Sequence, residues 1–214
     1  MLALITGANR GIGAALRDIL SKDYEVIGTA RTAPKQPGWQ DLDQSDPASI
    51  ADLAARIDRP LDLLVCNAGI YPDKGQNLAT GYPPAMWAEG FATNVTGPFL
   101  LVQALLPRLR EARGKIALIS SQMASHERAP GGSYIYRASK AALLNLGRNL
   151  ATDLKPDSIA VGIYHPGWVR TDMGGDHAAI SPEESARGLA RGFAALSPDT
   201  TGVFETWDGH PHPY

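Results

Sequence analysis

The chain has 214 residues, of which 20 are Lys or Arg and 22 are Asp or Glu, giving a formal net charge of −2. Acids and bases are mixed along the chain without a basic run that would follow a phosphate backbone, which argues against a nucleic-acid partner. The longest apolar stretches are strand-sized and fall short of the ~20 residues of a membrane-spanning helix, so no membrane association is expected.

The start of the chain and its cysteine content favour a cytoplasmic protein. The sequence enters the apolar stretch Leu2–Ile5 almost at once, without the basic segment, apolar core and cleavage site of a secretory signal. Its single cysteine, Cys66, excludes an internal disulfide and is interpreted as a small core residue.

Short apolar runs rich in β-forming residues alternate with helix-patterned stretches in the first third of the chain. The expected strands and helices, in chain order, are Leu2–Thr6, Ile12–Leu20, Glu25–Ala30, Ile50–Ile57 and Leu61–Cys66. This alternation predicts βαβ units around a parallel sheet. A further strand is expected at Trp39–Leu42, although too few residues separate it from Arg31 for a full crossover helix.

The remaining chain continues the alternation. A long helical region over Ala85–Leu109 contains Gly97-Pro98, where a bend is expected because proline interrupts the hydrogen-bond ladder. The elements expected after it are Lys115–Ser120, Tyr136–Leu154, Ile159–Tyr164, Pro182–Leu196 and Val203–Trp207. The sequence therefore predicts a single α/β domain over residues 1–214, a doubly wound Rossmann fold with a parallel sheet of about seven strands and helices on both faces.

A glycine-rich turn, Thr6–Gly13, follows the first expected strand and opens the first expected helix. Glycines permit a tight turn and the close approach of a pyrophosphate to the amide groups of a helix N-terminus. Such turns also serve merely to join a strand to a helix, so this segment alone leaves cofactor binding open.

The end of the second expected strand indicates which dinucleotide is preferred. An acid at this point accepts the 2′-hydroxyl of NAD, but the sequence there is Thr29-Ala30-Arg31-Thr32. Arg31, with Arg10 from the glycine-rich turn, can offer planar donors to the 2′-phosphate of NADP. The alternative is that both arginines are ordinary solvated side chains.

Tyr136 and Lys140 are four residues apart and therefore share one face of the expected helix. A phenol with a pKa of about 10 exchanges protons better near neutrality when a neighbouring cation stabilises its phenolate. Such pairs also occur by chance on helix surfaces. Ser120 and Ser121 come after the apolar run Ile116–Ile119, at the end of this expected strand and at the sheet edge where ligands bind, and a hydroxyl there can hydrogen-bond a substrate oxygen.

The chain carries a set of motifs in this order: Thr6–Gly13, Cys66–Gly69, Asn94, Ser121, Tyr136 and Lys140. With this set, the chain resembles the short-chain dehydrogenase/reductase family over nearly its full length. Asp43, Pro166-Gly167 with Thr171, and the closing Thr201-Gly202 and Asp208-Gly209 also match. Within the family, His165–Met173 with Trp207–Gly209 resembles the small carbonyl-reductase and C-signal-like subgroup.

The resemblance implies a role for each matching residue. Tyr136 is the general acid/base, Lys140 lowers its pKa and holds the nicotinamide ribose, Ser121 positions the carbonyl oxygen, and Asn94 anchors a water that relays protons to Lys140. The implied cofactor-binding residues are Gly7, Asn9, Arg10, Gly11, Ile12, Gly13, Arg31, Asp43, Asn67, Ala68, Gly69, Tyr136, Lys140, Pro166, Gly167, Val169 and Thr171. Ala124, where the family often has glycine, and the longer spacing from Ser121 to Tyr136 leave the substrate open.

The expected function is that of an NADP(H)-dependent oxidoreductase, with NAD(H) disfavoured, that transfers a hydride between nicotinamide and a small carbonyl or alcohol. One alternative is an NADP-binding regulatory or signalling protein that keeps the fold and acts through a partner; a flavodoxin-like binder is a third. No group of Cys, His or carboxylates has zinc-ligand spacing, so no catalytic metal is expected. Relatives of this fold form homodimers, homotetramers or monomers, and the sequence does not choose among them.

Overall fold

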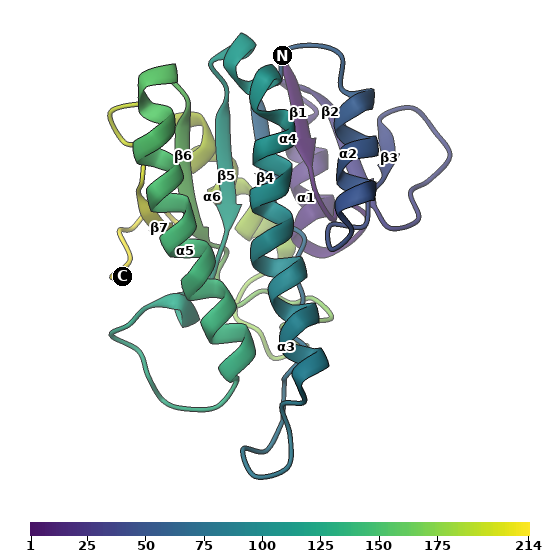
Figure 1. Ribbon diagram of the computed structural model, residues 1–214. Helices are drawn as coiled ribbons and strands as arrows, with labels where there is room; N and C mark the ends of the chain where they lie inside the picture. The colour runs from purple at the N-terminus through teal and green to yellow at the C-terminus, as the bar shows by residue number, and fades with distance from the viewer.

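A seven-stranded parallel sheet runs through the middle of the molecule in the computed structural model, which describes residues 1–214 (Figure 1). The strand order is β3-β2-β1-β4-β5-β6-β7, and every neighbouring pair is parallel. The strands are β1 (Leu2–Ile5), β2 (Glu25–Ala30), β3 (Trp39–Asp41), β4 (Leu63–Cys66), β5 (Lys115–Ile119), β6 (Ala160–His165) and β7 (Phe204–Thr206).

Helices cover both faces of the sheet, as the sequence predicts. They are α1 (Gly11–Leu20), α2 (Pro47–Arg56), α3 (Pro84–Phe91), α4 (Gly97–Ala112), α5 (Tyr134–Leu154) and α6 (Pro182–Ala195). In Figure 1, α2, α4 and α5 lie in front of the sheet, while α1 and α6 lie behind it and contact each other. This is the doubly wound arrangement of a Rossmann fold.

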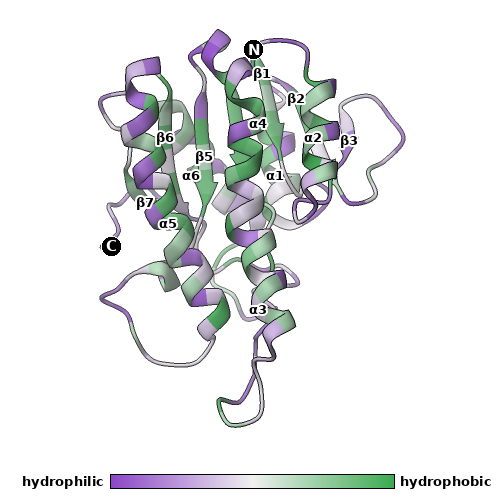
Figure 2. Cartoon of the chain, viewed as in Figure 1, coloured by the Kyte–Doolittle hydropathy of each residue, from purple (hydrophilic) through white to green (hydrophobic).

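Alternation along the central strands divides the core into two layers. Leu2 and Leu4 of β1 pack into a cluster with residues of α2, α4 and α5. Their neighbours Ala3 and Ile5 pack into a second cluster with residues of α1 and α6. Because successive side chains of a strand point to opposite faces, a strand that is buried on both sides is apolar throughout. Figure 2 accordingly shows the inner strands in the hydrophobic colour.

The strand expected at Trp39–Leu42 is present as β3, at the edge of the sheet. It spans Trp39–Asp41 and pairs with β2 through the register Gly28↔Trp39, one residue shorter than expected. No helix lies between β2 and β3. The loop between the two strands is instead held by the Asp41 carboxylate, which accepts a 2.7 Å hydrogen bond from the backbone N–H of Ala33. A covering loop can replace a crossover helix here because β3 is half-exposed.

The long helical region is interrupted as predicted, but the break lies before Gly97-Pro98 instead of at it. Helix α3 ends at Phe91, a π-helical turn spans Ala92–Thr96, and α4 begins at Gly97. Pro98 lies in the first turn of α4 and has no N–H to donate back into the π-helical turn, where the Thr93 carbonyl accepts a 2.8 Å hydrogen bond from Gln44 Nε2. Gly97 is required sterically, because a Cβ at this position would overlap the backbone carbonyl of Gln44.

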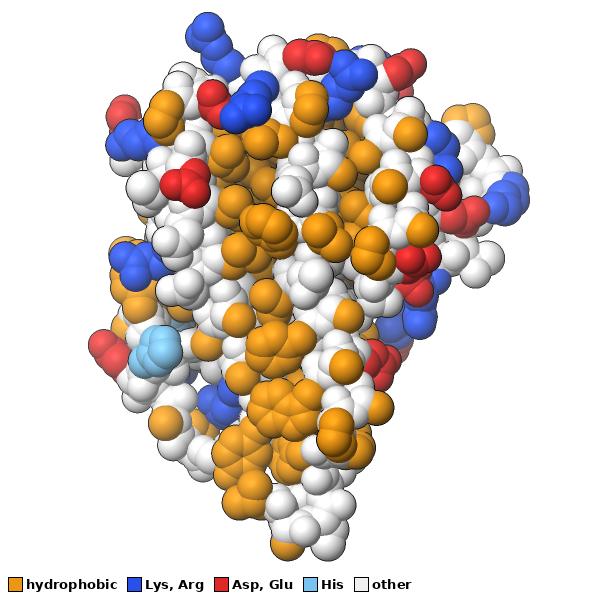
Figure 3. Space-filling model, viewed as in Figure 1, with side chains coloured by type: hydrophobic (Ala, Val, Ile, Leu, Met, Phe, Trp, Pro, Cys, Tyr) orange, Lys and Arg blue, Asp and Glu red, His pale blue; other side chains and the backbone are white.

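Hydrophobic side chains gather on the face that carries α4 and α5 (Figure 3). Partly buried residues of these two helices flank the core beneath this face, among them Leu100, Leu106, Ala141, Leu146 and Leu150. None of the helices is both long enough and apolar enough to span a bilayer.

Candidate active site and cofactor cradle

The candidate site residues follow the carboxyl ends of neighbouring strands. The glycine-rich turn follows β1, Asn67–Gly69 follows β4, Ser121 follows β5 and Pro166 follows β6. All strands of the sheet are parallel, so these segments meet at one edge. The strand order reverses between β1 and β4, and such switch points are where open α/β sheets bind ligands.

The glycine-rich turn is held tightly against the segment after β4. The Asn67 Nδ2 group donates to the carbonyls of Thr6 at 2.9 Å and Gly7 at 3.2 Å. In return, the Thr6 hydroxyl accepts from the backbone N–H of Asn67 and Ala68. Gly7 has φ +64°, and a Cβ at Gly13 would overlap the Gly7 carbonyl. The turn therefore needs glycine at both positions.

The first turn of α1 offers the features that a dinucleotide pyrophosphate requires. Arg10, the residue that precedes the helix, gives its amide groups no side-chain cap. Uncapped N–H groups at a helix N-terminus, with the helix dipole behind them, favour a bound anion. The residues present thus fit a phosphate-bearing cofactor at this end of the cradle.

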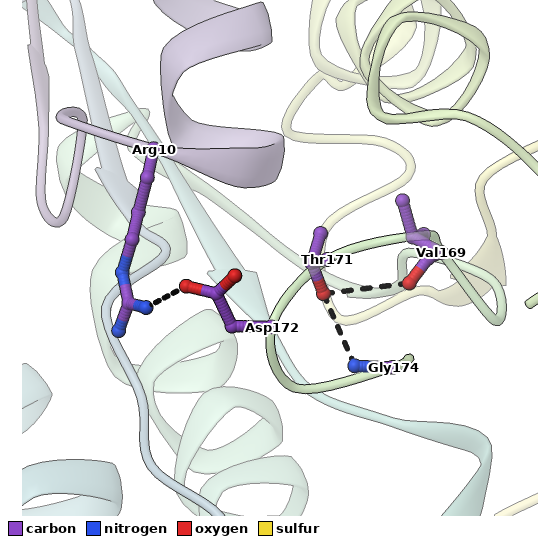
Figure 4. Close-up of polar contacts among 5 residues, drawn as sticks. All are labelled: Arg10, Val169, Thr171, Asp172 and Gly174. Atoms are coloured by element: carbon purple, nitrogen blue, oxygen red, sulfur yellow. Dashed lines mark hydrogen bonds and ion pairs between the residues drawn. The ribbon is translucent and has the colours of Figure 1, made fainter. Parts of the chain in front are cut away.

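The loop after β6 closes over this turn (Figure 4). Arg10 of the glycine-rich turn and Asp172 of this loop form an ion pair, and both side chains are exposed. Behind them, the Thr171 hydroxyl donates to the Val169 carbonyl at 3.4 Å and accepts from the Gly174 N–H at 3.2 Å. Thr171 also lies against Gly11, whose hypothetical Cβ would be 3.1 Å from its Cγ2. The sequence-predicted Arg10, Gly11, Val169 and Thr171 therefore converge.

Arg31 and Asp43 lie near each other, just after strands β2 and β3. Arg31 is exposed just beyond β2. Hydrogen bonds from the side chain and backbone of Ser45 lower the pKa of Asp43, and the Arg31 charge lowers it further. The Asp43 carboxylate is thus already engaged in the local turn, whereas the Arg31 guanidinium is free to meet solvent or a ligand.

Tyr136 and Ser121 meet at the deep end of the site. Burial raises the pKa of Tyr136 to about 12, a shift that the nearby Ser121 hydroxyl opposes. Ser121 lies just after β5 and also accepts a 3.1 Å hydrogen bond from the Met123 N–H. The two hydroxyls predicted to hold a substrate oxygen are therefore adjacent.

Lys140 lies one helical turn beyond Tyr136 on α5 and is 4% exposed. Its Nζ donates a 2.9 Å hydrogen bond to the Ile119 carbonyl and lies 5.7 Å from the centre of the Tyr136 ring. Burial lowers the pKa of Lys140 to about 8. Burial also raises the pKa of Tyr136, and the role of Lys140 in lowering that pKa stays a prediction.

Asn94 sits in the π-helical turn between α3 and α4 and is buried. Its Oδ1 accepts from the Ile70 N–H at 2.9 Å, while its Nδ2 donates to the Ile70 carbonyl and to the Ser139 hydroxyl. A Cβ on Gly69 would come within 3.3 Å of Lys140 Nζ and 3.2 Å of Asn94 Oδ1. Asn94 thus ties the segment after β4 to α5, and the water relay stays a prediction.

Two residues that the sequence analysis missed contact helix α5 beside Tyr136 directly. Tyr71 stacks on Tyr136, with ring centroids 4.3 Å apart and an interplanar angle of 22°. Asp73 is fully buried and accepts hydrogen bonds from the backbone N–H groups of Ile135 and Tyr136. An acid after Pro72 has the composition of an ordinary turn, so no local signal distinguishes it.

A pocket of about 370 Å³ borders Gly167, the glycine of the predicted Pro166-Gly167 contact. Its walls come from the loop after β5, the loop after β6 and the C-terminal tail, and include Gln122, Arg128, His165, Trp168, Trp207 and His212. The tail is tied to the first of these loops, because the Tyr214 carbonyl accepts from the His126 N–H at 3.0 Å. No group of three or more His, Cys, Asp or Glu side chains is arranged as metal ligands.

The family model for short chain dehydrogenases matches residues 1–180. The chain belongs to the short-chain dehydrogenase family. Among curated relatives, C-signal of Myxococcus xanthus is 39% identical over 158 residues, which cover 72% of this chain and 93% of that protein.

Solved structures of short-chain dehydrogenases superpose on nearly the whole chain. The NADPH-bound carbonyl reductase from chicken fatty liver is 30% identical, with a TM-score of 0.89 and coverage of 99% of this chain and 98% of that one. Carbonyl reductase Sniffer of D. melanogaster is 28% identical, with a TM-score of 0.91 and the same coverage. The resemblance to this family and the Rossmann fold are therefore confirmed, and the chain is a family oxidoreductase by descent.

Proposed function

We propose that this protein uses NADPH to reduce a small carbonyl compound to an alcohol, or catalyses the reverse reaction with NADP, with Tyr136 as the general acid/base. The observation that carries the proposal is the adjacency of Tyr136, Ser121 and Lys140 at the sheet edge that also holds the glycine cradle. A phenol, a hydroxyl and an ammonium beside a dinucleotide cradle are the groups that carbonyl reduction needs.

The cofactor would lie along this edge. The uncapped first turn of α1 would hold the pyrophosphate, with Asn9 and Ile12 of the same turn beside it. Arg31 and Arg10 would bind the 2′-phosphate. The end of β2 carries no carboxylate that would accept the 2′-hydroxyl of NAD. The rest of the cofactor would be lined by Asn67–Gly69, Pro166, Gly167 and Val169. The carbonyl reductase from chicken fatty liver was crystallised with NADPH, which supports the choice of NADP over NAD.

When bound, NADPH supplies the hydride to the carbonyl carbon. Ser121 would hold the substrate oxygen through its hydroxyl, and Tyr136 would donate its phenolic proton to that oxygen as negative charge develops there. With its pKa raised to about 12, the phenol is protonated at neutral pH, as the proton donor of the reductive direction must be. Lys140, buried beside the ring, would stabilise the phenolate left on Tyr136.

The 39% sequence identity to C-signal favours a second function, because the name of that relative describes a signalling protein. In this alternative the chain binds NADP and acts through a partner protein. The enzyme is preferred because a binding module has no need for a buried phenol beside a buried ammonium.

The test is oxidation of NADPH, and separately of NADH, with a panel of aldehydes, ketones and quinones, in wild type and Tyr136→Phe. Turnover that prefers NADPH and is lost in Tyr136→Phe supports the reductase. Tight binding of NADPH without turnover dependent on Tyr136 would move the assignment to the regulatory alternative. A preference for NADH would contradict the roles of Arg10 and Arg31.

Assembly and location remain predictions. A homodimer or homotetramer would bury the hydrophobic face that carries α4 and α5 (Figure 3). Light scattering coupled to size exclusion distinguishes both from a monomer, and fractionation of cells tests the cytoplasmic location.

A further inference from the structure

The helix that carries the catalytic phenol is not capped by its own sequence. Helix α5 begins at Tyr134, so Tyr136 belongs to its first turn. The preceding residue, Ser133, has left-handed backbone geometry with φ +51° and makes no side-chain hydrogen bond to the helix. The first amide groups of such a helix require an acceptor from elsewhere, and a buried one left without a partner is costly.

Asp73 supplies that acceptor from 62 residues earlier in the chain. Its Oδ2 accepts a 2.8 Å hydrogen bond from the Ile135 N–H, and its Oδ1 accepts a 3.2 Å hydrogen bond from the Tyr136 N–H. The Asp73 side chain is fully buried, at 0% exposure. A carboxylate that accepts backbone N–H groups at a helix N-terminus forms charge-assisted bonds and interacts favourably with the helix dipole.

Tyr71 makes a second contact with the same turn. Its ring stacks on the ring of Tyr136, and its hydroxyl is hydrogen-bonded to the Ser133 hydroxyl. One face of the catalytic ring is therefore covered by an aromatic neighbour, while the Asp73 carboxylate binds the backbone of the same residue. Together these contacts restrict both the position and the tilt of the phenol.

The segment that makes these contacts is itself anchored near the catalytic lysine. Asn94 accepts from the Ile70 N–H and donates to the Ile70 carbonyl, both at 2.9 Å. The Ile70–Asp73 segment therefore links Asn94 at one end to Tyr136 at the other. A short, doubly anchored segment can transmit position because its ends are fixed by hydrogen bonds instead of by loop packing alone.

We propose that Asp73 is a positioning residue for Tyr136, with Tyr71 as a second support acting on the same ring. This inference rests on the proposed function, because it assigns the two residues to the geometry of that reaction. Asp73 holds the backbone of Tyr136 and Tyr71 covers its ring; neither transfers a proton. A misplacement of about 1 Å costs on the order of 100-fold in rate, so the loss of either contact is expected to act on kcat.

The first experiment replaces Asp73 by Asn. The carboxamide keeps one oxygen acceptor but turns an NH₂ group toward the second backbone N–H, so one bond is lost with almost no change in volume. We expect kcat for the carbonyl to fall at least about tenfold, with the Kd for NADPH, measured by fluorescence, changed less than twofold. An unchanged kcat in a folded Asp73→Asn protein overturns the proposal.

The matched control is Asp46→Ala. Asp46 caps α2 by accepting a 2.9 Å hydrogen bond from the Ala48 N–H, and α2 carries none of the proposed catalytic residues. Loss of this cap is expected to lower Tm while kcat at saturating cofactor stays at the wild-type value. If Asp73→Asn behaves in the same way, Asp73 is an ordinary cap and the positioning role is wrong.

A double-mutant comparison separates action through Tyr136 from general damage. A residue that works only by placing the Tyr136 hydroxyl has nothing left to place in Tyr136→Phe, so Asp73→Asn should lower the residual rate of that variant less than twofold. A full tenfold loss in the Tyr136→Phe background contradicts the inference. If Tyr136→Phe retains wild-type turnover, the proposed function fails instead, independently of Asp73.

Tyr71→Leu provides a second route if Asp73→Asn does not fold. Tyr71 is half-buried, so its replacement disturbs the core less, yet it removes the stack on Tyr136. Tyr71→Phe keeps the stack and removes only the hydrogen bond to Ser133. We expect kcat to fall in Tyr71→Leu and to be largely restored in Tyr71→Phe; equal kcat values for wild type and Tyr71→Leu would contradict the support assigned to this ring.

Discussion

The hydroxyl of Ser120 donates a 3.0 Å hydrogen bond to the backbone carbonyl of Lys140, so it faces α5. Its neighbour Ser121 faces the phenol of Tyr136. The adjacent residues after β5 are therefore engaged differently: Ser120 ties the sheet to α5, and Ser121 lies beside the phenol of Tyr136, where we propose that it holds the substrate oxygen.

The two serines should respond differently to removal of the hydroxyl. Ser121→Ala is expected to lower kcat/KM by about 100-fold, the scale of losing one donor to a developing oxyanion, and to lower stability by about 1 kcal/mol because the Met123 N–H loses its acceptor. Ser120→Ala should lower stability by about 1 kcal/mol, the scale of one buried hydrogen bond, and leave kcat/KM near wild type. Steady-state kinetics and thermal melts of both variants check this, and the reverse pattern would exchange the assignments.

Substitution of Gly13 should disrupt the cofactor cradle. In Gly13→Ala, the new Cβ would overlap the Gly7 carbonyl and lie 2.7 Å from Asn67 Nδ2, so the turn must open. Overpacking of this kind costs about 1–3 kcal/mol, and NADPH affinity should fall at least tenfold. Gly75→Ala is the control, since Gly75 has φ +77° but no atom within 4 Å of a hypothetical Cβ; it should lose some stability and keep its NADPH affinity.

The ion pair between Arg10 and Asp172 leads to a prediction about cofactor choice. Asp172 competes with a 2′-phosphate for the guanidinium of Arg10. Arg10→Ser should therefore raise KM for NADPH about tenfold, since hydrogen bonds to charged groups contribute about 1.5–3 kcal/mol, and leave KM for NADH nearly unchanged. Asp172→Asn should lower KM for NADPH. Arg59→Ala, which removes an exposed pair with Glu25, should change neither KM.

His165 should make the protein sensitive to acid. Burial, with smaller contributions from the charges of His212 and Arg128, lowers the pKa of His165 from 6.5 to about 4. Between these values the unfolded chain binds a proton that the folded chain does not, so stability is complete above pH 6.5 and falls as the pH drops toward 4.

The loss at pH 5 is on the order of 2 kcal/mol, at about 1.4 kcal/mol per pKa unit. His165→Asn should remove this part of the difference between urea unfolding at pH 7 and at pH 5. His177→Asn, a substitution at an exposed histidine, should keep the wild-type difference. An equal pH dependence in His165→Asn and wild type would show that His165 is not the group that titrates.

The fold was accessible from the sequence because its signals are local. Each buried strand is an apolar run of a few residues, each long helix shows one apolar face, and the glycine-rich turn marks the first junction between them. Even β3 could be predicted. The loop that replaces its crossover helix could not, because it depends on the hydrogen bond between Asp41 and Ala33, and a periodic pattern of apolar residues does not indicate such a contact.

The candidate site was accessible in part. Tyr136 and Lys140 are four residues apart, so their common face follows from helix geometry alone. Asp73 and Tyr71 reach the same helix across more than 60 positions of chain, and their partners are backbone groups or a ring face that carry no sequence signature. The burial of Lys140 and the hydrogen bond from its ammonium to the Ile119 carbonyl were equally hidden, because both depend on how distant elements pack together.

The strand order has a consequence for synthesis on the ribosome. Read in chain order, β2 adds beside β1, β3 beside β2, β4 on the free side of β1, and β5, β6 and β7 each beside the strand made just before it. No strand has to be inserted between two that are already paired. The nascent chain can thus extend its sheet from an open edge at every stage. After β3 has paired, one edge of the sheet stays at β3, and the other edge, which could otherwise pair with another chain, is covered by each strand that emerges next.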